Sequence, residues 1–325
     1  MDSIITDETI FDDAFIPQRL VAREGQIKEI AKCLSPARSG KSIRNLLISG
    51  PPGVGKTSVC RWILNEHFAR MSVYVNCFSK RTEHKAWEEI LLQAGFIIHG
   101  RESTSELEKK FVKSGRKMVI CLDEADHLKS TEILKTLARS SGGIILICNN
   151  PRSISDIETR IRSGLLFNEV EFKPYSYEEI LSILRARVSH GLRPGALGND
   201  LLSLTAKLSH GDARIGLQTI KVAAKDAESN GLERITAEDI KSATKCTRKY
   251  NALYLLGKLT EDQRAVYEIL KKNKNMNSGR LYSDYRKLVK NPVVDRAYRK
   301  RMKKMEELGL VKSQGSGRWK KYALI

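Results

Sequence analysis

A glycine-rich loop that ends in Lys56 and Thr57 is the first feature of this sequence whose residue types indicate chemistry. It lies in LLISGPPGVGKTS, residues 46–58, between an apolar run and a helix-forming run. Glycines let a loop turn its backbone N–H groups toward phosphates, and the next helix N-terminus adds its positive dipole end. We therefore expect a nucleotide site, with Lys56 at the β- and γ-phosphates and Thr57 at Mg²⁺. The residues expected to bind the nucleotide are Gly53, Val54, Gly55, Lys56, Thr57 and Ser58.

Two adjacent acids follow the apolar run at residues 118–123. At the end of a strand beside the glycine-rich loop, Asp123 is expected to bind Mg²⁺ directly or through water. Glu124 is expected to polarise the water that attacks the γ-phosphate. The alternative is an acid pair favoured only by a helix dipole. The glycine-rich loop upstream favours the catalytic interpretation.

Three further polar residues are candidates for sensing the γ-phosphate. The apolar run at residues 142–148 ends in Asn149, which we expect to orient the attacking water, with Asn150 as the alternative. Arg160 is expected to point toward the phosphate of a neighbouring molecule. Arg214, at the start of a helical segment, is expected to reach the γ-phosphate of its own chain. Surface ion pairs are the alternative for both arginines.

The elements that must position these residues follow an α/β pattern. Five short apolar or β-branched runs with helix-period segments between them predict a five-stranded parallel sheet. The expected strands are Asn45–Ser49, Ser72–Asn76, Met118–Asp123, Gly143–Cys148 and Glu169–Phe172. After Pro174 the pattern is helical, beginning with the capping box Ser176 and Glu179. The expected domains are a nucleotide-binding core at 1–173, a small helical lid at 174–246, a linker at 247–258 and a terminal domain at 259–325.

The terminal domain carries most of the positive charge. Residues 261–325 hold 18 Lys/Arg and 7 Asp/Glu, which is +11 of the +19 on the whole chain. Three helical segments and a glycine-containing hairpin predict a winged-helix domain that binds DNA. The third segment, Val293 to Leu308, has an apolar stripe of Val294, Tyr298, Met302, Met305 and Leu308. The residues expected to contact DNA are Arg296, Arg299, Lys300, Lys303, Arg318, Lys320 and Lys321. A solvated basic face is the alternative.

Other function classes are disfavoured. No apolar stretch approaches the roughly 20 residues that span a bilayer. The first residues are acidic where a secretory signal would be basic, so we expect no membrane partner and a cytoplasmic, nucleoid-associated protein. The six cysteines show no CxxC pair, which indicates reduced structural thiols.

The order of these motifs resembles the archaeal initiator family related to the eukaryotic origin recognition complex and its helicase-loading partner, which belongs to the AAA+ ATPases. The segments that carry the resemblance are Glu8 to Ile27, Val75 to Cys77, Thr159 to Leu165, Phe172 to Val188 and Gly211 to Arg214. The resemblance implies that Arg160 is the finger and Arg214 the second sensor. It also implies that Tyr175 and Arg187 line the nucleotide pocket beside residues 16–21.

The resemblance further implies an ATP-dependent replication initiator with slow, switch-like hydrolysis. Its expected cofactors are ATP or ADP and Mg²⁺. Its expected partners are double-stranded origin DNA, an MCM-type replicative helicase and other initiator copies. Two alternatives stay open, a clamp-loader-type ATPase and an ATP-gated DNA-binding regulator of a plasmid or virus.

Overall fold

The computed structural model describes residues 3–128, 130, 132–149, 167–257, 259–307, 310–315 and 317–324. The chain divides into two compact units, Met1–Ile240 and Lys241–Ile325. Within the described part of the chain, no helix is both long and apolar enough to cross a membrane.

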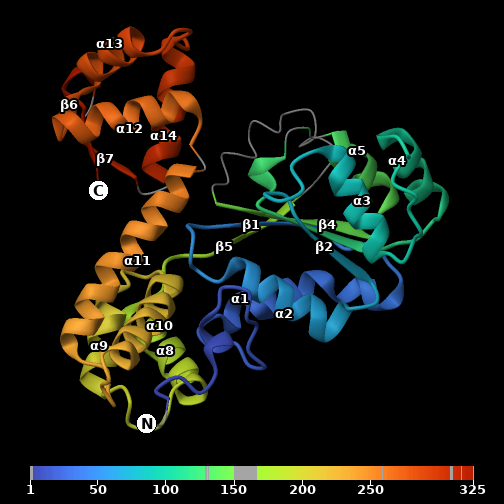
Figure 1. Cartoon of the computed structure of the whole chain (residues 1–325). Helices are drawn as coiled ribbons and strands as arrows, with labels where there is room; N and C mark the ends of the chain where they lie inside the picture. Colours follow the sequence, from blue (N-terminus) through green and yellow to red (C-terminus); the bar gives the residue numbers. More distant parts are fainter. Residues whose placement is uncertain are drawn as a thin grey trace. The chain divides into compact units, whose positions relative to one another are not determined.

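The first unit is built on a five-stranded parallel sheet, as the sequence predicts (Figure 1). Its strands are β1 (Asn45–Ser49), β2 (Ser72–Asn76), β3 (Val119–Asp123), β4 (Gly143–Cys148) and β5 (Phe167–Glu171). The order β2-β3-β4-β1-β5 puts β4 between the strand that enters the glycine-rich loop and the strand that ends in the acids. The fifth strand begins two residues earlier than expected, and Phe172 follows it.

Helices cover both faces of the sheet (Figure 1). One face packs against α1 (Glu24–Leu34) and α2 (Lys56–Phe68), and the other against α3 (Glu83–Gln93), α4 (Thr104–Lys113) and α5 (Glu132–Ser140). Because side chains alternate along a strand, Leu46 and Ile48 of β1 face α2, while Leu47 faces the other layer. Burial on both faces explains why these strands are continuous apolar runs.

The first unit also contains short 3-10 turns. They are η1 (Glu8–Phe11), η2 (Ser35–Ser39) and η3 (Ala125–His127).

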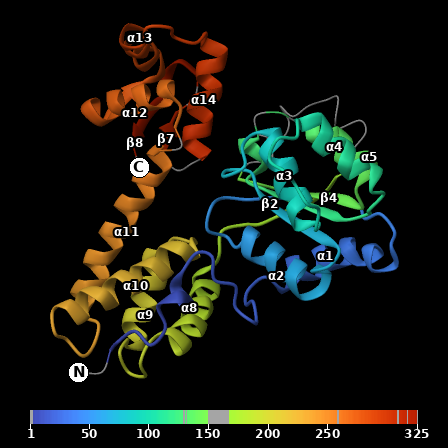
Figure 2. The same ribbon diagram turned by 45° about the vertical axis from the view of Figure 1, so that its right-hand side comes forward.

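A helical lid follows the sheet within the first unit. Its helices are α8 (Tyr177–Gly191), α9 (Asn199–Leu208) and α10 (Ala213–Ser229). The predicted capping box is present at the start of α8, where Glu179 N–H donates to Ser176 Oγ and Ser176 N–H to Glu179 Oε2. Figure 2 shows the N-terminal segment in dark blue beside α8 and α10.

The next helix, α11 (Ala237–Gly257), is longer than the sequence predicts. Residues 247–257, expected as a polar linker, form its C-terminal half. The stretch 247–256 holds no glycine or proline, so nothing in it ends a helix before Gly257. The domain borders themselves remain a prediction.

The second unit continues with α12 (Glu261–Asn273), β6 (Asn275–Asn277), α13 (Ser278–Leu288), α14 (Asp295–Glu307), β7 (Val311–Gln314), η4 (Gly317–Trp319) and β8 (Lys321–Leu324). The three strands form an antiparallel sheet in the order β6-β8-β7. Tyr285, Tyr298 and Met302 lie in its core. Val294 does not join them, because α14 begins only at Asp295 and Val294 is 72% exposed.

Candidate nucleotide site

The polar residues predicted at three strand ends meet at one edge of the sheet. β1 leads into the glycine-rich loop, β3 ends in Asp123, and Asn149 follows β4. Because the strands are parallel and β4 lies between β1 and β3, their carboxyl ends face the same side. Ligands of open α/β sheets bind at this edge.

The loop itself has the backbone of a phosphate cradle. Gly53 and Gly55 have φ of 77° and 86°, a region that favours glycine. Gly55 is the N-cap of α2, and among the described residues no side chain accepts a hydrogen bond from the first N–H groups of this helix. These donors are therefore available to an anion. The adjacent predicted residues Val54 and Ser58 are buried and half-buried.

Lys56 joins the loop to β4. Its ammonium donates to the carbonyls of Gly50 and Pro51, both at 2.7 Å, and to Asn149 Oδ1 at 3.1 Å. Burial lowers the pKa of Lys56 to about 8, and the positive charge of Arg214 contributes to the shift. The lysine and the predicted sensor Asn149 therefore lie together, whereas Asn150 is outside the described residues.

Asp123 and Thr57 form an oxygen-rich pair beside the loop. Asp123 Oδ2 accepts from Thr57 Oγ1 at 2.7 Å and from the hydroxyl of Tyr74 at 2.6 Å. Burial raises the pKa of Tyr74, and the charge of Asp123 adds to the effect, so the tyrosine stays a donor. A hydroxyl and one carboxylate fit Mg²⁺, which binds through few protein oxygens and the phosphates of its nucleotide. In the described residues, no cluster of three or more His, Cys, Asp or Glu offers a separate metal site.

Glu124 has a strained backbone. Its φ of 51° and ψ of 42° place it in the left-handed region, which is uncommon for a residue with a side chain. Its N–H donates to Asp123 Oδ1 at 2.8 Å, and its carboxylate lies 3.8 Å from the imidazole of His127. Such strain gathers at functional sites because it fixes the direction of a side chain. The conformation supports the role predicted for Glu124.

The lid closes directly on the loop. Asp212 is the N-cap of α10 and accepts from the N–H of Arg214 at 2.9 Å. The N–H of Ala213 donates to the carbonyl of Gly53 at 3.1 Å, and a Cβ at Gly53 would overlap the Asp212 carboxylate. Burial raises the pKa of Asp212, while the charge of Arg214 opposes this shift.

Arg214 carries a donor suited to an anion. Its Nε is buried and has no hydrogen-bond partner among the described residues, although it lies 3.9 Å from Asp212 Oδ1. A buried donor of a charged group costs free energy unless a ligand accepts from it. A phosphate beside Lys56 would supply that acceptor.

Arg23 is a central residue of the site that the sequence did not reveal. Its side chain is 4% exposed, and it donates to the carbonyls of Val54 at 3.1 Å and Lys173 at 2.7 Å. The guanidinium lies over the Tyr175 ring at 3.8 Å, and the Tyr175 hydroxyl lies where a Cβ at Gly55 would be. Tyr175 thus contacts the glycine-rich loop, and its role in lining the nucleotide pocket stays a prediction. A lone arginine before a helix gives no signal of such burial, so only the geometry identifies Arg23.

Arg187 holds the N-terminal segment to the lid. It donates to the carbonyls of Ile10 at 2.9 Å and Phe15 at 3.4 Å and lies over the Phe15 ring. These contacts fall just before residues 16–21, beside which the sequence analysis expected it. The predicted finger Arg160 lies outside the described residues.

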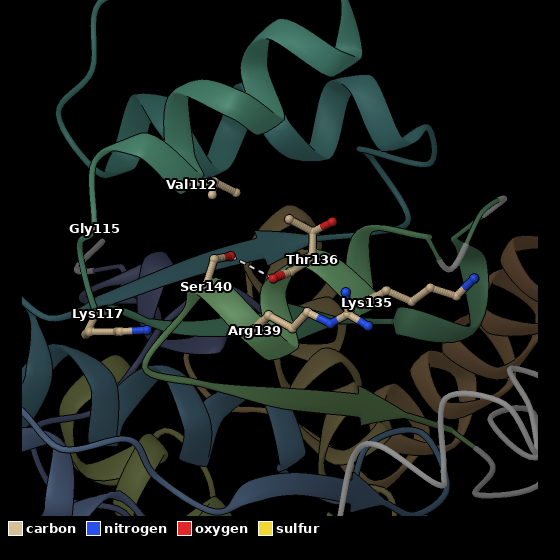
Figure 3. Close-up of a pocket in the computed structure, with 7 residues that line it drawn as sticks. All are labelled: Val112, Gly115, Lys117, Lys135, Thr136, Arg139 and Ser140. Atoms are coloured by element: carbon tan, nitrogen blue, oxygen red, sulfur yellow. Dashed lines mark hydrogen bonds between the residues drawn. The ribbon is translucent and has the colours of Figure 1, made fainter.

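A separate basic pocket has a volume of about 410 Å³, and Figure 3 shows the residues that line it. Its lining residues are Val112, Gly115, Lys117, Lys135, Thr136, Arg139 and Ser140. Arg139 lies in the last turn of α5, where a cation stabilises the negative end of the helix dipole. This stabilisation of the helix explains why an arginine occupies position 139, and no ligand is needed to explain it.

The second unit presents a basic helix face. On α14, Tyr298, Met302 and Met305 are buried, as predicted. The exposed residues of the helix include Arg296, Arg299, Lys300 and Lys303. Arg299 pairs with Asp295 at 2.7 Å.

The hairpin after α14 differs in part from the prediction. Lys321 is exposed, but Lys320 pairs with Glu306 at 3.3 Å and lies over the Tyr322 ring. The side chain of Arg318 lies outside the described part of the structure. Lys320 therefore braces the hairpin against α14.

Comparisons with known proteins agree with this site. Residues 19–147 match the model of an AAA ATPase domain, and residues 181–245 match that of a Cdc6 AAA+ ATPase-type lid domain. The curated ORC1-type DNA replication protein 9 of Halobacterium salinarum is 27% identical to this chain, and the alignment covers 99% of this chain and 94% of that protein.

The solved structures that resemble this chain include archaeal ORC proteins. The Aeropyrum pernix ORC1 protein in complex with DNA has a TM-score of 0.75 and 26% identity, over 100% of this chain and 94% of that one. The A. pernix ORC2 protein in ADPNP-ADP complexes has a TM-score of 0.71 at 20% identity, over 99% and 94% of the two chains.

The fold, the glycine-rich loop and the lid define an AAA+ ATPase that binds nucleotide. Within that class, the chain is similar over nearly its whole length to archaeal ORC1-type DNA replication proteins, and its residues 181–245 match a Cdc6-type lid.

Proposed function

We propose that this protein is an ATP-dependent initiator of DNA replication that binds duplex DNA at an origin and helps to load a replicative helicase of the MCM type. The observation that carries the proposal is that one chain joins a phosphate site closed by a lid to a strongly basic helix-and-hairpin unit. The ORC1-type names of the curated relative and of the DNA-bound structure support it.

The nucleotide acts as a switch in this proposal. The N–H groups at the start of α2 and the ammonium of Lys56 bind its phosphates. Thr57 and Asp123 would hold Mg²⁺, which would neutralise charge on the phosphates. The buried Nε of Arg214 donates to the γ-phosphate, so the position of α10 depends on whether this phosphate is present.

Hydrolysis uses two residues at the strand ends. Glu124 accepts a proton from the attacking water, and Asn149 orients that water. Asn149 Oδ1 accepts from Lys56 at 3.1 Å, so the amide lies beside the ammonium that binds the phosphates. Arg160 is proposed to act on the site of a neighbouring initiator copy. Turnover need not be fast for a switch.

The second unit is proposed to bind DNA as a winged helix. Its order of helices and its β6-β8-β7 sheet suit that fold, in which α14 enters the major groove. Arg296, Lys300 and Lys303 would contact phosphates and bases there, together with Lys321 of the hairpin. A clamp-loader subunit would carry a helical collar in this place, so the antiparallel strands argue against that alternative.

The test is duplex binding by the intact protein with ATP, with ADP and without nucleotide. Lys56→Ala is expected to remove the dependence on nucleotide, whereas Lys41→Ala, at an exposed lysine, is expected to keep it. Six to ten phosphate contacts would lower affinity by about 10³ to 10⁵ between 50 and 200 mM salt. Binding that prefers no chromosomal fragment and ignores the nucleotide would refute the initiator proposal.

A further inference from the structure

The hairpin of the second unit exposes a tryptophan. Trp319 is 81% exposed, whereas Trp87 is fully buried and Trp62 donates from its indole to the carbonyl of Gln18. Trp319 is also the most exposed large apolar side chain in the described part of the chain. Its position was not among those expected to contact DNA.

The backbone that carries this indole is held firmly. The N–H of Ser278, at the start of α13, donates to the carbonyl of Lys320 at 2.8 Å. At Gly315, with φ of 85°, a Cβ would come within 2.9 Å of the Trp319 carbonyl, so the turn is tight. Lys320 is tied to Glu306 of α14. The tryptophan is therefore presented to solvent from an anchored position.

The surroundings of the indole are basic and polar. Lys321 follows on β8, and Lys312 of the opposite strand is also exposed. The last 65 residues carry a net charge of +11. An apolar ring beside exposed lysines matches a polyanion that also offers aromatic surface, which is what a nucleic acid duplex provides through its phosphates and bases.

We propose that Trp319 is an apolar wedge that enters the DNA duplex at a base step and partly unstacks it. This inference rests on the proposed function and adds the mode of contact. Apolar wedges of this kind kink the duplex and favour steps that unstack easily, such as pyrimidine–purine steps. Trp319 would therefore contribute to the choice of site without a hydrogen bond to a base.

The test uses the full-length protein and a duplex with 2-aminopurine at successive positions. Insertion of Trp319 unstacks the neighbouring base, so wild-type protein is expected to raise the fluorescence at one step. Trp319→Ala is expected to remove this signal and to weaken binding by about fivefold to 150-fold, the range for loss of one stacked base. Trp319→Phe is expected to retain part of both effects.

Lys321→Gln is the matched control, because it changes the adjacent residue and removes a charge instead of a ring. It is expected to lower the slope of log affinity against log salt by about 0.9, whereas Trp319→Ala leaves this slope unchanged. Thermal melting should be the same for wild type and Trp319→Ala, since the indole packs against little.

The outcomes separate the wedge from the proposed function. Duplex binding by Trp319→Ala at wild-type affinity, or weaker binding with the 2-aminopurine signal intact, would overturn the wedge and leave the initiator proposal standing. A wild-type protein that fails to bind duplex at low salt would overturn both. If Trp319→Ala lost binding to anionic vesicles that the wild type binds, and still bound DNA as the wild type does, Trp319 would be assigned to a lipid surface. That result would also overturn the wedge.

Discussion

Replacement of Arg23 by methionine is expected to loosen the nucleotide site before any nucleotide is present. The guanidinium donates to Val54 in the glycine-rich loop and to Lys173 at the entry to the lid, and it lies 3.8 Å from the centroid of the Tyr175 ring. Methionine keeps the length and much of the apolar contact. It loses both donors and the charge over the ring.

The magnitude follows from those contacts. Hydrogen bonds from a charged donor contribute about 1.5–3 kcal/mol each. The cation–π contact contributes about 0.5–2 kcal/mol. The guanidinium no longer has to be desolvated in the variant, which offsets part of the loss. We therefore expect the free energy of unfolding of the first unit to fall by about 2–4 kcal/mol.

Urea unfolding of the full-length protein without nucleotide measures this loss, and ADP titration measures its effect on the site. Arg38→Met is the matched control, because Arg38 is exposed and lies over the Phe68 ring at 5.3 Å without a hydrogen bond. Its expected cost is below about 1 kcal/mol. A midpoint for Arg23→Met equal to that of Arg38→Met would refute the reasoning, and so would an unchanged ADP affinity.

Three further predictions concern the same site. Glu124→Gln is expected to slow ATP hydrolysis by about 10² to 10⁴ without loss of ATP binding, since glutamine cannot take a proton from water; unchanged turnover would exclude Glu124 as the base. The affinity for ADP without Mg²⁺ is expected to stay constant below about pH 8 and to fall by up to about tenfold per pH unit above it. The reason is that Lys56 in the free protein has a pKa of about 8 and must regain its proton when ADP binds. In Lys56→Arg the affinity should stay constant over the same pH range. Gly53→Ala is expected to destabilise the nucleotide-free protein more than Gly40→Ala does, since both residues have positive φ but only the Cβ at Gly53 meets the Asp212 carboxylate; equal melting temperatures would contradict the contact.

The features that could be predicted from sequence are those encoded locally. The strands are apolar runs because both faces of the sheet are buried, and the loop glycines carry their φ requirement in their residue type. The capping box at Ser176 needs only residues three apart.

The features that were missed depend on contacts between distant residues. Arg23 donates to carbonyls that lie 31 and 150 residues away, and an arginine is ordinarily expected at the surface. In the sequence Tyr74 is only one residue of an expected strand, yet its hydroxyl donates to Asp123 on the neighbouring strand. Val294 followed the helical period but lies before the first residue of α14, where that period does not yet apply.

The N-terminal segment connects the lid to the glycine-rich loop. Lys221 of α10 pairs with Glu8 and Asp12 of this segment, and Glu228 of the same helix accepts from the N–H groups of Ile4 and Ile5. The segment ends at Arg23, which donates to the carbonyl of Val54 in the loop and to that of Lys173 before the lid. The same segment therefore contacts α10 at one end and the glycine-rich loop at the other.

In the proposed mechanism the lid has two states, one with the γ-phosphate bound and one without it. With Arg214 on the γ-phosphate, the lid, the segment and the loop are all satisfied at once. Without that phosphate, the buried Nε of Arg214 has no acceptor among the described residues, so the closed position of the lid loses part of its advantage. A nucleotide present at a thousandfold its dissociation constant favours the closed state by about 4 kcal/mol if it binds that state alone.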